Sequence, residues 1–127
     1  PYNNQMLQMP AEGFKQMAGG MASNMTSRND KLGLLTNWIL TSDRKTYVYG
    51  FTDLLKLDLR DTLKSVSAKT LVVGASFPTA EQAKVVFESQ YANLSNKHIT
   101  IAPANCKHFV MFDAAEWFYS QLNTFLE

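Results

Sequence analysis

The fold is decided by one stretch near the end of the chain, Asn105-Cys106-Lys107-His108-Phe109-Val110-Met111-Phe112-Asp113. A short β-branched segment at about His98–Ala102 precedes it and predicts a strand. The segment from Ala114 to Leu126 follows it, and its apolar residues recur at helical spacing, which predicts an amphipathic helix. His108 is therefore expected in a loop between two regular elements, where catalytic side chains are often found.

The start of the final helix has its own predicted signal. Asp113 is a residue type that commonly caps helices, and Glu116 follows at the spacing of a capping box. We therefore expect the Asp113 side chain to accept a hydrogen bond from the first turn of that helix.

This part of the chain resembles a known family. His108 to Asp113, followed by Glu116-Trp117-Phe118, is similar to the C-terminal histidine segment of the α/β-hydrolases. The resemblance continues upstream through residues 58–63 and 68–74. In that family the histidine is the last member of a triad whose chain order is nucleophile, acid, histidine.

The resemblance implies an α/β fold: the C-terminal part of an α/β-hydrolase, with a parallel βαβ unit preceded by a helical cap. Residues 1–57 would be the helical cap region. Residues 58–127 would be the C-terminal part of the hydrolase core, made of the βαβ unit and the terminal helix.

Residues 1–57 show helical periodicity and no alternating strand pattern. Three helices are expected, the second capped within Ser27–Asp30 and the third by Ser42-Asp43. We expect their apolar faces to be covered by something other than one another. The third helix should bury four apolar side chains: Tyr47, Phe51, Leu54 and Leu55.

From Asp58 the pattern changes to that of a parallel sheet. Thr70–Gly74 is a continuous apolar, β-branched run, as in a strand covered on both faces. Thr79 and Gln82 have the spacing of a capping box and predict a helix. Ile99–Ile101 forms the centre of the second strand, so these residues predict a βαβ unit.

Ligands of parallel sheets bind beyond the carboxyl ends of the strands. The loops that follow the two predicted strands therefore place His108 near Ser76 and Phe77. By resemblance His108 is the catalytic base, and Phe77 and Phe109 are apolar walls of the substrate site. Ser76 is a further predicted substrate-binding residue. Without the resemblance, a hydrogen-bonded structural histidine is the favoured interpretation. His98 precedes the second strand and is assigned to the opposite edge and the surface.

Two members of the triad are not found. The resemblance places an acid just after the first strand, yet Ala75–Thr79 contains no carboxylate. The acid is therefore expected outside this chain, or a neutral group such as Ser76 orients the histidine instead. No Gly-x-Ser-x-Gly is present, and Gly74–Pro78 lacks the closing glycine. We interpret the chain as a fragment whose nucleophile lies on a missing N-terminal half.

Composition excludes several classes of partner. Twelve basic and eleven acidic residues give a net charge of +1, which argues against nucleic acid and membrane surfaces. The single cysteine, Cys106, excludes an internal disulfide and is interpreted as a small, partly buried thiol. The resemblance implies no cofactor and no metal.

The sequence leaves two hypotheses. In the first, the intact parent hydrolyses an ester-like, lactone or related acyl small molecule through the triad, and this chain alone is inactive. In the second, the chain is a non-catalytic pairing module or belongs to a pseudoenzyme, and His108 is structural. The uncharged segment Leu71–Gly74 has the composition of a central strand. We therefore expect a homodimer or association with the missing half.

Overall fold

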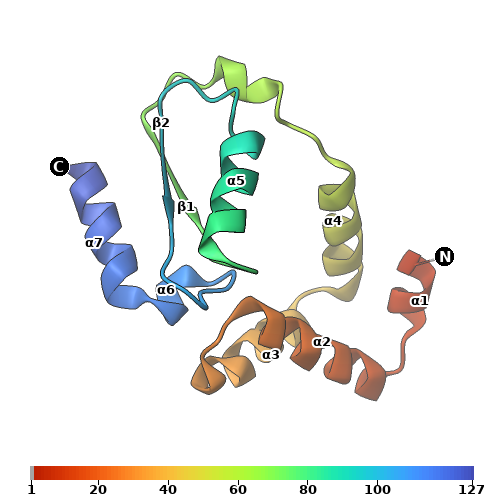
Figure 1. Ribbon diagram of the computed structural model, residues 1–127. Coiled ribbons are helices and arrows are strands. Elements are labelled where there is room, and N and C mark those ends of the chain that lie inside the picture. The colour runs from red at the N-terminus through yellow and green to blue at the C-terminus, as the bar shows by residue number, and fades with distance from the viewer. Residues whose placement is uncertain (1) are drawn as a thin grey trace. The chain divides into compact units, whose positions relative to one another are not determined.

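The computed structural model describes residues 2–127, a mixed α/β chain that is mostly helical (Figure 1). It divides into two compact units, Pro1–Leu57 and Asp58–Glu127. The first unit is helical, and the second contains a two-stranded parallel sheet. No helix within residues 2–127 combines the length and the apolar character that crossing a membrane requires.

The first unit contains no strand within residues 2–57, as the sequence predicts. It has four α-helices where three are expected, joined in part by the short 3₁₀ turn η1. Helix α1 is the unexpected one. The elements are α1 Tyr2–Gln8, α2 Ala11–Met25, η1 Asn29–Lys31, α3 Leu32–Thr41 and α4 Arg44–Lys56.

The predicted helix starts differ in outcome. Asp43 caps α4 as expected, because its carboxylate accepts hydrogen bonds from the backbone N–H of Thr46 at 2.8 Å and from its hydroxyl at 2.7 Å. The expected cap of α3 is wrong. Arg28 and Asp30 pair with each other at 2.8 Å instead, and a 3₁₀ turn leads into the helix without a side-chain cap.

The four helices bury a small core of their own. Its buried residues come from all four helices, and Phe14 of α2 contacts two residues of α4. The Phe14 ring meets Tyr47 edge-on at 6.2 Å between centroids, and the Arg44 guanidinium lies 4.1 Å from the Phe14 centroid. The helices were expected to be covered by something other than one another, and this expectation is wrong for part of their apolar surface. The side chains that the helices bury against one another are Met6, Phe14, Ala18, Ile39 and Val48.

The C-terminal half of α4 is a second correction. Leu54 and Leu55 are predicted to be buried, yet they are 65% and 69% exposed. Helix α4 has 13 residues, and α1, which packs on it, has 7. At 1.5 Å per residue these helices span roughly 20 Å and 10 Å, so α1 covers only part of α4.

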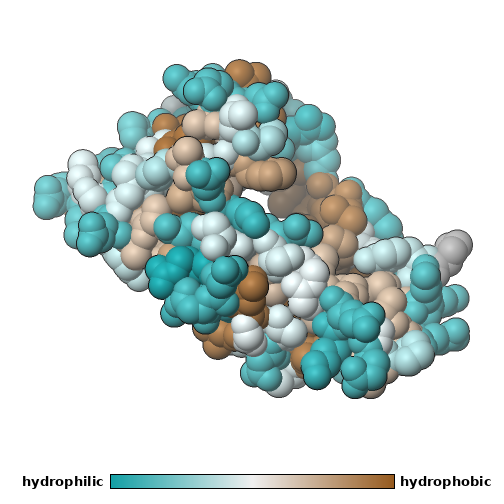
Figure 2. Space-filling model, turned by 60° about the horizontal axis from the view of Figure 1, so that its bottom comes forward, coloured by the Kyte–Doolittle hydropathy of each residue, from teal (hydrophilic) through white to brown (hydrophobic). Residues whose placement is uncertain are grey.

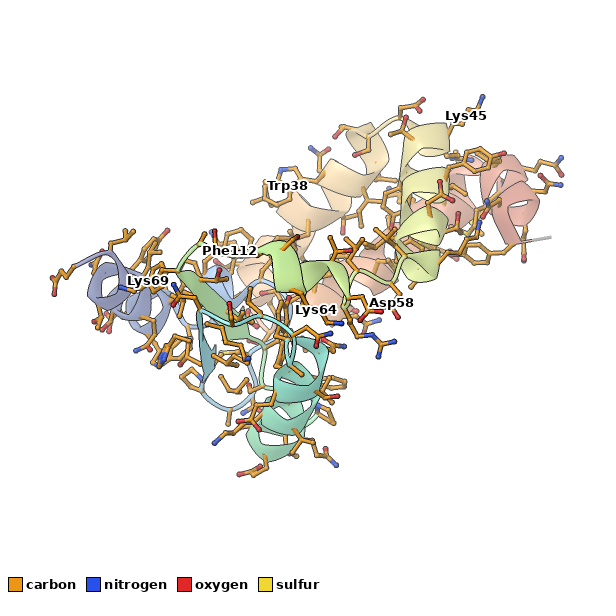
Figure 3. The ribbon with its side chains drawn as sticks, turned by 90° about the horizontal axis from the view of Figure 1, so that it is seen from above. Trp38, Lys45, Asp58, Lys64, Lys69 and Phe112 are labelled. Atoms are coloured by element: carbon orange, nitrogen blue, oxygen red, sulfur yellow. The ribbon has the colours of Figure 1, made fainter. Side chains whose placement is uncertain are left out.

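Other apolar side chains of the first unit also reach the surface. Trp38 is 45% exposed and points away from α3 (Figure 3). Figure 2 shows apolar residues, in brown, among the polar ones on one face of the molecule. Trp38 therefore lies outside the buried core of the four helices.

The second unit is a βαβ arrangement with a terminal helix. Strands β1 (Thr70–Gly74) and β2 (Lys97–Ile101) run parallel, with Gly74 opposite Ile101. Thr79 caps the crossover helix as predicted, accepting from the Gln82 N–H at 3.3 Å. The remaining elements are η2 Thr62–Ser65, α5 Ala80–Gln90, α6 Val110–Asp113 and α7 Ala115–Leu126.

Helices α5 and α7 cover opposite faces of the sheet (Figure 1). On the α7 side, Trp117 and Phe118 pack against a buried cluster of Ala102, Cys106 and Val110. At the far end of α7, the Lys69 ammonium donates to the Phe125 carbonyl at 3.0 Å and lies over its ring (Figure 3). The sheet is therefore enclosed on both faces, as its apolar sequence requires.

The edges of the sheet are less complete than its faces. Within the described residues, β1 is hydrogen-bonded to one strand only, β2. The other edge of β1 therefore has no strand partner there, although its apolar sequence is that of a central strand.

Gly74 marks where the α5 face packs most closely. A Cβ at this position would lie 2.7 Å from the Ile101 Cδ1 atom and from the Phe87 ring. We expect Gly74→Ala to lower the free energy of unfolding by about 1–3 kcal/mol, the usual cost of overpacking. The measurement is denaturant unfolding followed by circular dichroism.

The matched control is Gly50→Ala in α4, where a Cβ would meet no atom within 4 Å. Alanine there should stabilise the protein by about 0.5–1 kcal/mol, because glycine is unfavourable inside a helix. A neutral Gly74→Ala would contradict the close packing of α5 on the sheet.

Candidate functional site

Two loops follow the carboxyl ends of the parallel strands. Residues 75–79 follow β1, and residues 102–109 follow β2. Since Gly74 and Ile101 are register partners, both loops begin at the carboxyl ends of the paired strands, on the same side of the sheet. Ligands of parallel sheets bind beyond these carboxyl ends.

Ser76 bonds one loop to the other. Its backbone N–H donates to the Cys106 carbonyl at 3.0 Å, and its hydroxyl donates to the Pro103 carbonyl at 2.5 Å. The same hydroxyl oxygen accepts from the Cys106 N–H at 3.0 Å. Ser76 is only 2% exposed, so its polar atoms hold the loops together. Its hydroxyl is thus already bonded to residues 103–106, whereas the sequence suggested that it could orient His108.

His108 lies two residues beyond this junction, and its side chain is exposed. Its ring stands perpendicular to that of Phe109, with 5.1 Å between centroids. Phe109 in turn stacks on Phe112 at 5.3 Å. Within the part of the chain that the structure describes, the imidazole forms no hydrogen bond or ion pair, so both ring nitrogens are free to bind another molecule.

The two predicted apolar walls differ in exposure. Phe77 follows Ser76 in the first loop and is 72% exposed, whereas Phe109 is half-buried. Phe109 is fixed by its ring contacts, but a phenyl ring as open as that of Phe77 lacks cover on most of its surface. Phe77 thus leaves apolar surface available at the same edge of the sheet as His108.

Asp113 does not cap the terminal helix, and this prediction is wrong. Residues Val110–Asp113 form the separate turn α6, and α7 begins at Ala115 after Ala114, without a side-chain cap. The Asp113 carboxylate instead turns back and accepts a hydrogen bond from the Lys107 N–H at 2.8 Å. The capping pattern correctly indicated that the Asp113 side chain accepts a backbone hydrogen bond. The donor is the Lys107 N–H, however, and not an N–H of the first turn of α7.

Asn105 sets the direction of the second loop. Its φ of 70° lies in the left-handed region, which asparagine tolerates better than most residues. This role could not be predicted from the sequence, because an asparagine that follows Pro103-Ala104 in a loop is compatible with several turn types.

Cys106 is not a nucleophile candidate. It is a free cysteine, 3% exposed, within the cluster beneath α7. Burial raises the pKa of its thiol, and the nearby Asp113 charge raises that pKa further. A thiol that holds its proton this firmly is a poor nucleophile, which agrees with its interpretation as a packing residue.

No carboxylate of residues 2–127 is bonded to the imidazole. Glu81 lies in the first turn of α5, where an acidic side chain is favourable. Asp61 pairs with Lys64 at the surface, and Asp58 pairs with Arg60. The hydrogen bonds from Arg60 hold the pKa of Asp58 at about 2, so this carboxylate stays charged and paired.

His98 is exposed and lies near the start of β2, opposite Leu71. It is therefore at the amino end of the strand, away from the loop that carries His108, as the sequence predicts. In the described part of the chain, no three His, Cys, Asp or Glu side chains are grouped so that they could hold a metal ion.

No protein-family model matches the sequence, and no curated protein or solved structure gives a significant match.

Proposed function

We propose that this chain is the C-terminal part of an α/β-hydrolase and supplies its catalytic histidine, His108. The nucleophile and the acid come from outside residues 1–127. The substrate is a small ester, lactone or related acyl compound. In the reaction His108 removes the proton of the nucleophile, and it later activates the water that releases the acyl group.

The observation that carries the proposal is the state of the His108 loop. The imidazole is exposed and forms no hydrogen bond within the described residues, yet the backbone just before it is fixed. Lys107 is held by Asp113, and Cys106 is held by Ser76. A free side chain on a fixed loop is what a general base requires, because proton transfer depends on placement within hydrogen-bond reach.

Phe77 and Phe109 would form apolar walls for the acyl group, and residues 1–57 would act as the cap that selects it. Ser76 would stabilise the site because its hydroxyl bonds the loop after β1 to the loop after β2. These roles follow the resemblance of residues 108–118 to the histidine segment of the family, and the placement of the loops is compatible with them.

A second candidate is a non-catalytic pairing module. The observation that favours it is the missing acid, since no carboxylate of residues 2–127 is bonded to His108. A histidine without an acid is less well oriented for catalysis, although the acid can be supplied by another segment.

The open edge of β1 supports a partner in either case. A strand of apolar residues with unpaired backbone groups on one side favours pairing with another strand. The partner would be a second copy of the chain or the segment that carries the nucleophile. Light scattering should then give a mass above the 14.3 kDa of the chain, and a monomer that melts cooperatively would contradict this.

Ester turnover distinguishes the two functions. The full-length gene product should hydrolyse short-chain p-nitrophenyl esters, and the 127-residue chain alone should not exceed the uncatalysed rate. If the full-length product hydrolyses neither esters nor lactones, the pairing module is the better description.

A further inference from the structure

The half-buried carboxylate of Asp113 is bonded to the backbone beside His108. Asp113 belongs to α6, six residues after Lys107, and its carboxylate reaches back across the turn to the Lys107 N–H. The distance is 2.8 Å, within the range of charge-assisted hydrogen bonds. The bonded amide belongs to the residue directly before His108.

The surroundings place the carboxylate inside the loop and not at its edge. Burial raises the pKa of the Cys106 thiol, and the charge of the half-buried Asp113 raises that pKa further. Cys106 is in turn bonded to Ser76 through its N–H and its carbonyl. Two successive residues before His108 are thus held by hydrogen bonds. Cys106 is bonded to Ser76 of the neighbouring loop, and Lys107 is bonded to Asp113.

We propose that Asp113 is a positioning residue for His108: its carboxylate holds the Lys107 amide and thereby fixes the direction in which the imidazole leaves the loop. The catalytic part of this inference rests on the proposed function.

The physical reason is the high cost of imprecise placement in proton transfer. His108 has no side-chain hydrogen bond within the described residues, so its orientation depends on its backbone and on the Phe109 ring. If the Lys107 N–H is released, the planar peptide group between Cys106 and Lys107 can reorient through the φ and ψ angles beside it, and the His108 backbone and imidazole move with it. Displacements of about 1 Å can cost roughly a hundredfold in rate.

The test compares Asp113→Ala with Asp113→Asn in the full-length gene product. Alanine removes the acceptor, whereas asparagine keeps a carbonyl oxygen in nearly the same place. With a p-nitrophenyl ester, we expect Asp113→Ala to lower kcat by about tenfold to a hundredfold with little change in KM. Asp113→Asn should recover most of that loss.

Hydrogen exchange of the Lys107 amide is a second readout that does not depend on activity. Exchange should become at least about tenfold faster in Asp113→Ala, since the amide loses its acceptor, and should change little in Asp113→Asn. Asp61→Ala is the matched control, because Asp61 is an exposed carboxylate in the same unit that pairs with Lys64 at the surface. It should alter neither kcat nor this exchange rate.

The outcomes separate the inference from the proposed function. Equal losses in Asp113→Ala and Asp113→Asn would overturn it, because charge and not the bonded acceptor would then matter. Unchanged kcat in Asp113→Ala would also overturn it. If His108→Ala itself retains turnover, the proposed function falls, and the catalytic role of Asp113 falls with it. The exchange rate would still show whether Asp113 holds the loop.

Discussion

On the proposed function, His108→Ala should lower kcat/KM for ester hydrolysis by the full-length gene product by at least about 10³-fold, because removing the proposed catalytic histidine would leave only the catalysis due to binding and the oxyanion hole. The melting temperature should stay within about 2 °C of the wild type, since surface substitutions usually change stability by less than 0.5 kcal/mol. The imidazole is exposed and forms no hydrogen bond within residues 2–127, so little folding energy depends on it. Steady-state kinetics and a thermal melt on the same preparation provide both measurements.

His98→Ala is the matched control, because it removes the other exposed imidazole at the opposite end of β2. It should leave kcat/KM within about twofold, a difference of less than 0.5 kcal/mol. Near-wild-type turnover by His108→Ala would end the catalytic interpretation. A large loss of stability in that variant would instead favour a structural histidine.

The second large effect concerns the core of the first unit. Phe14→Ala should lower the free energy of unfolding by about 3–5 kcal/mol, the usual cost of removing a buried phenylalanine. Phe14 is 3% exposed, packs edge-on against Tyr47 and lies beneath the Arg44 guanidinium. Its removal deletes both interactions and leaves a cavity. Urea unfolding monitored by circular dichroism at 222 nm, where helices dominate the signal, is the measurement.

Tyr49→Ala is the control for this substitution. Tyr49 is an aromatic residue of α4 that is 40% exposed, so its truncation should cost less than about 1 kcal/mol. If both variants lose the same stability, the first unit does not depend on the Phe14 core, and its helices need cover from elsewhere.

The sheet and two of the helix starts could be predicted from the sequence. Strand β1 has the predicted limits, Thr70–Gly74, and β2 is shifted by one residue from the expected range. β1 is a continuous run of apolar and β-branched residues, and β2 has three β-branched residues in a row at 99–101, so local preference and packing favour the same structure in both. Asp43 and Thr79 cap their helices as predicted, because a free backbone N–H lies within reach of each side chain.

Other features depended on distant residues. Helix α1 has seven residues and no cap signal, so its formation depends on packing against α4. Leu54 and Leu55 continue the apolar face of α4, and their sequence does not reveal that α1 is too short to reach them. Asp113 was misassigned because two backbone groups compete for the same carboxylate, and only the fold places the Lys107 amide closer.

At the candidate site, the sequence indicated His108 and both loops but not the bonds that hold them. Ser76 was identified as a residue near His108, yet its partners lie 27 and 30 positions away in the chain. Such pairs have no local pattern, since any serine after a strand has the same appearance in the sequence. The roles of His108, Phe77 and Phe109 stay predictions that the kinetic tests decide.

The bonds of Ser76 also have a consequence for engineering this edge of the sheet. They bond the two loops to each other, so a change that breaks these bonds in one loop should also displace the other. Residues 77 and 78 lie outside that junction, whereas Thr79 caps α5. A library that varies positions 77 and 78 should therefore reshape the surface beside the histidine and leave the loop junction in place, whereas one that includes position 76 releases both loops together.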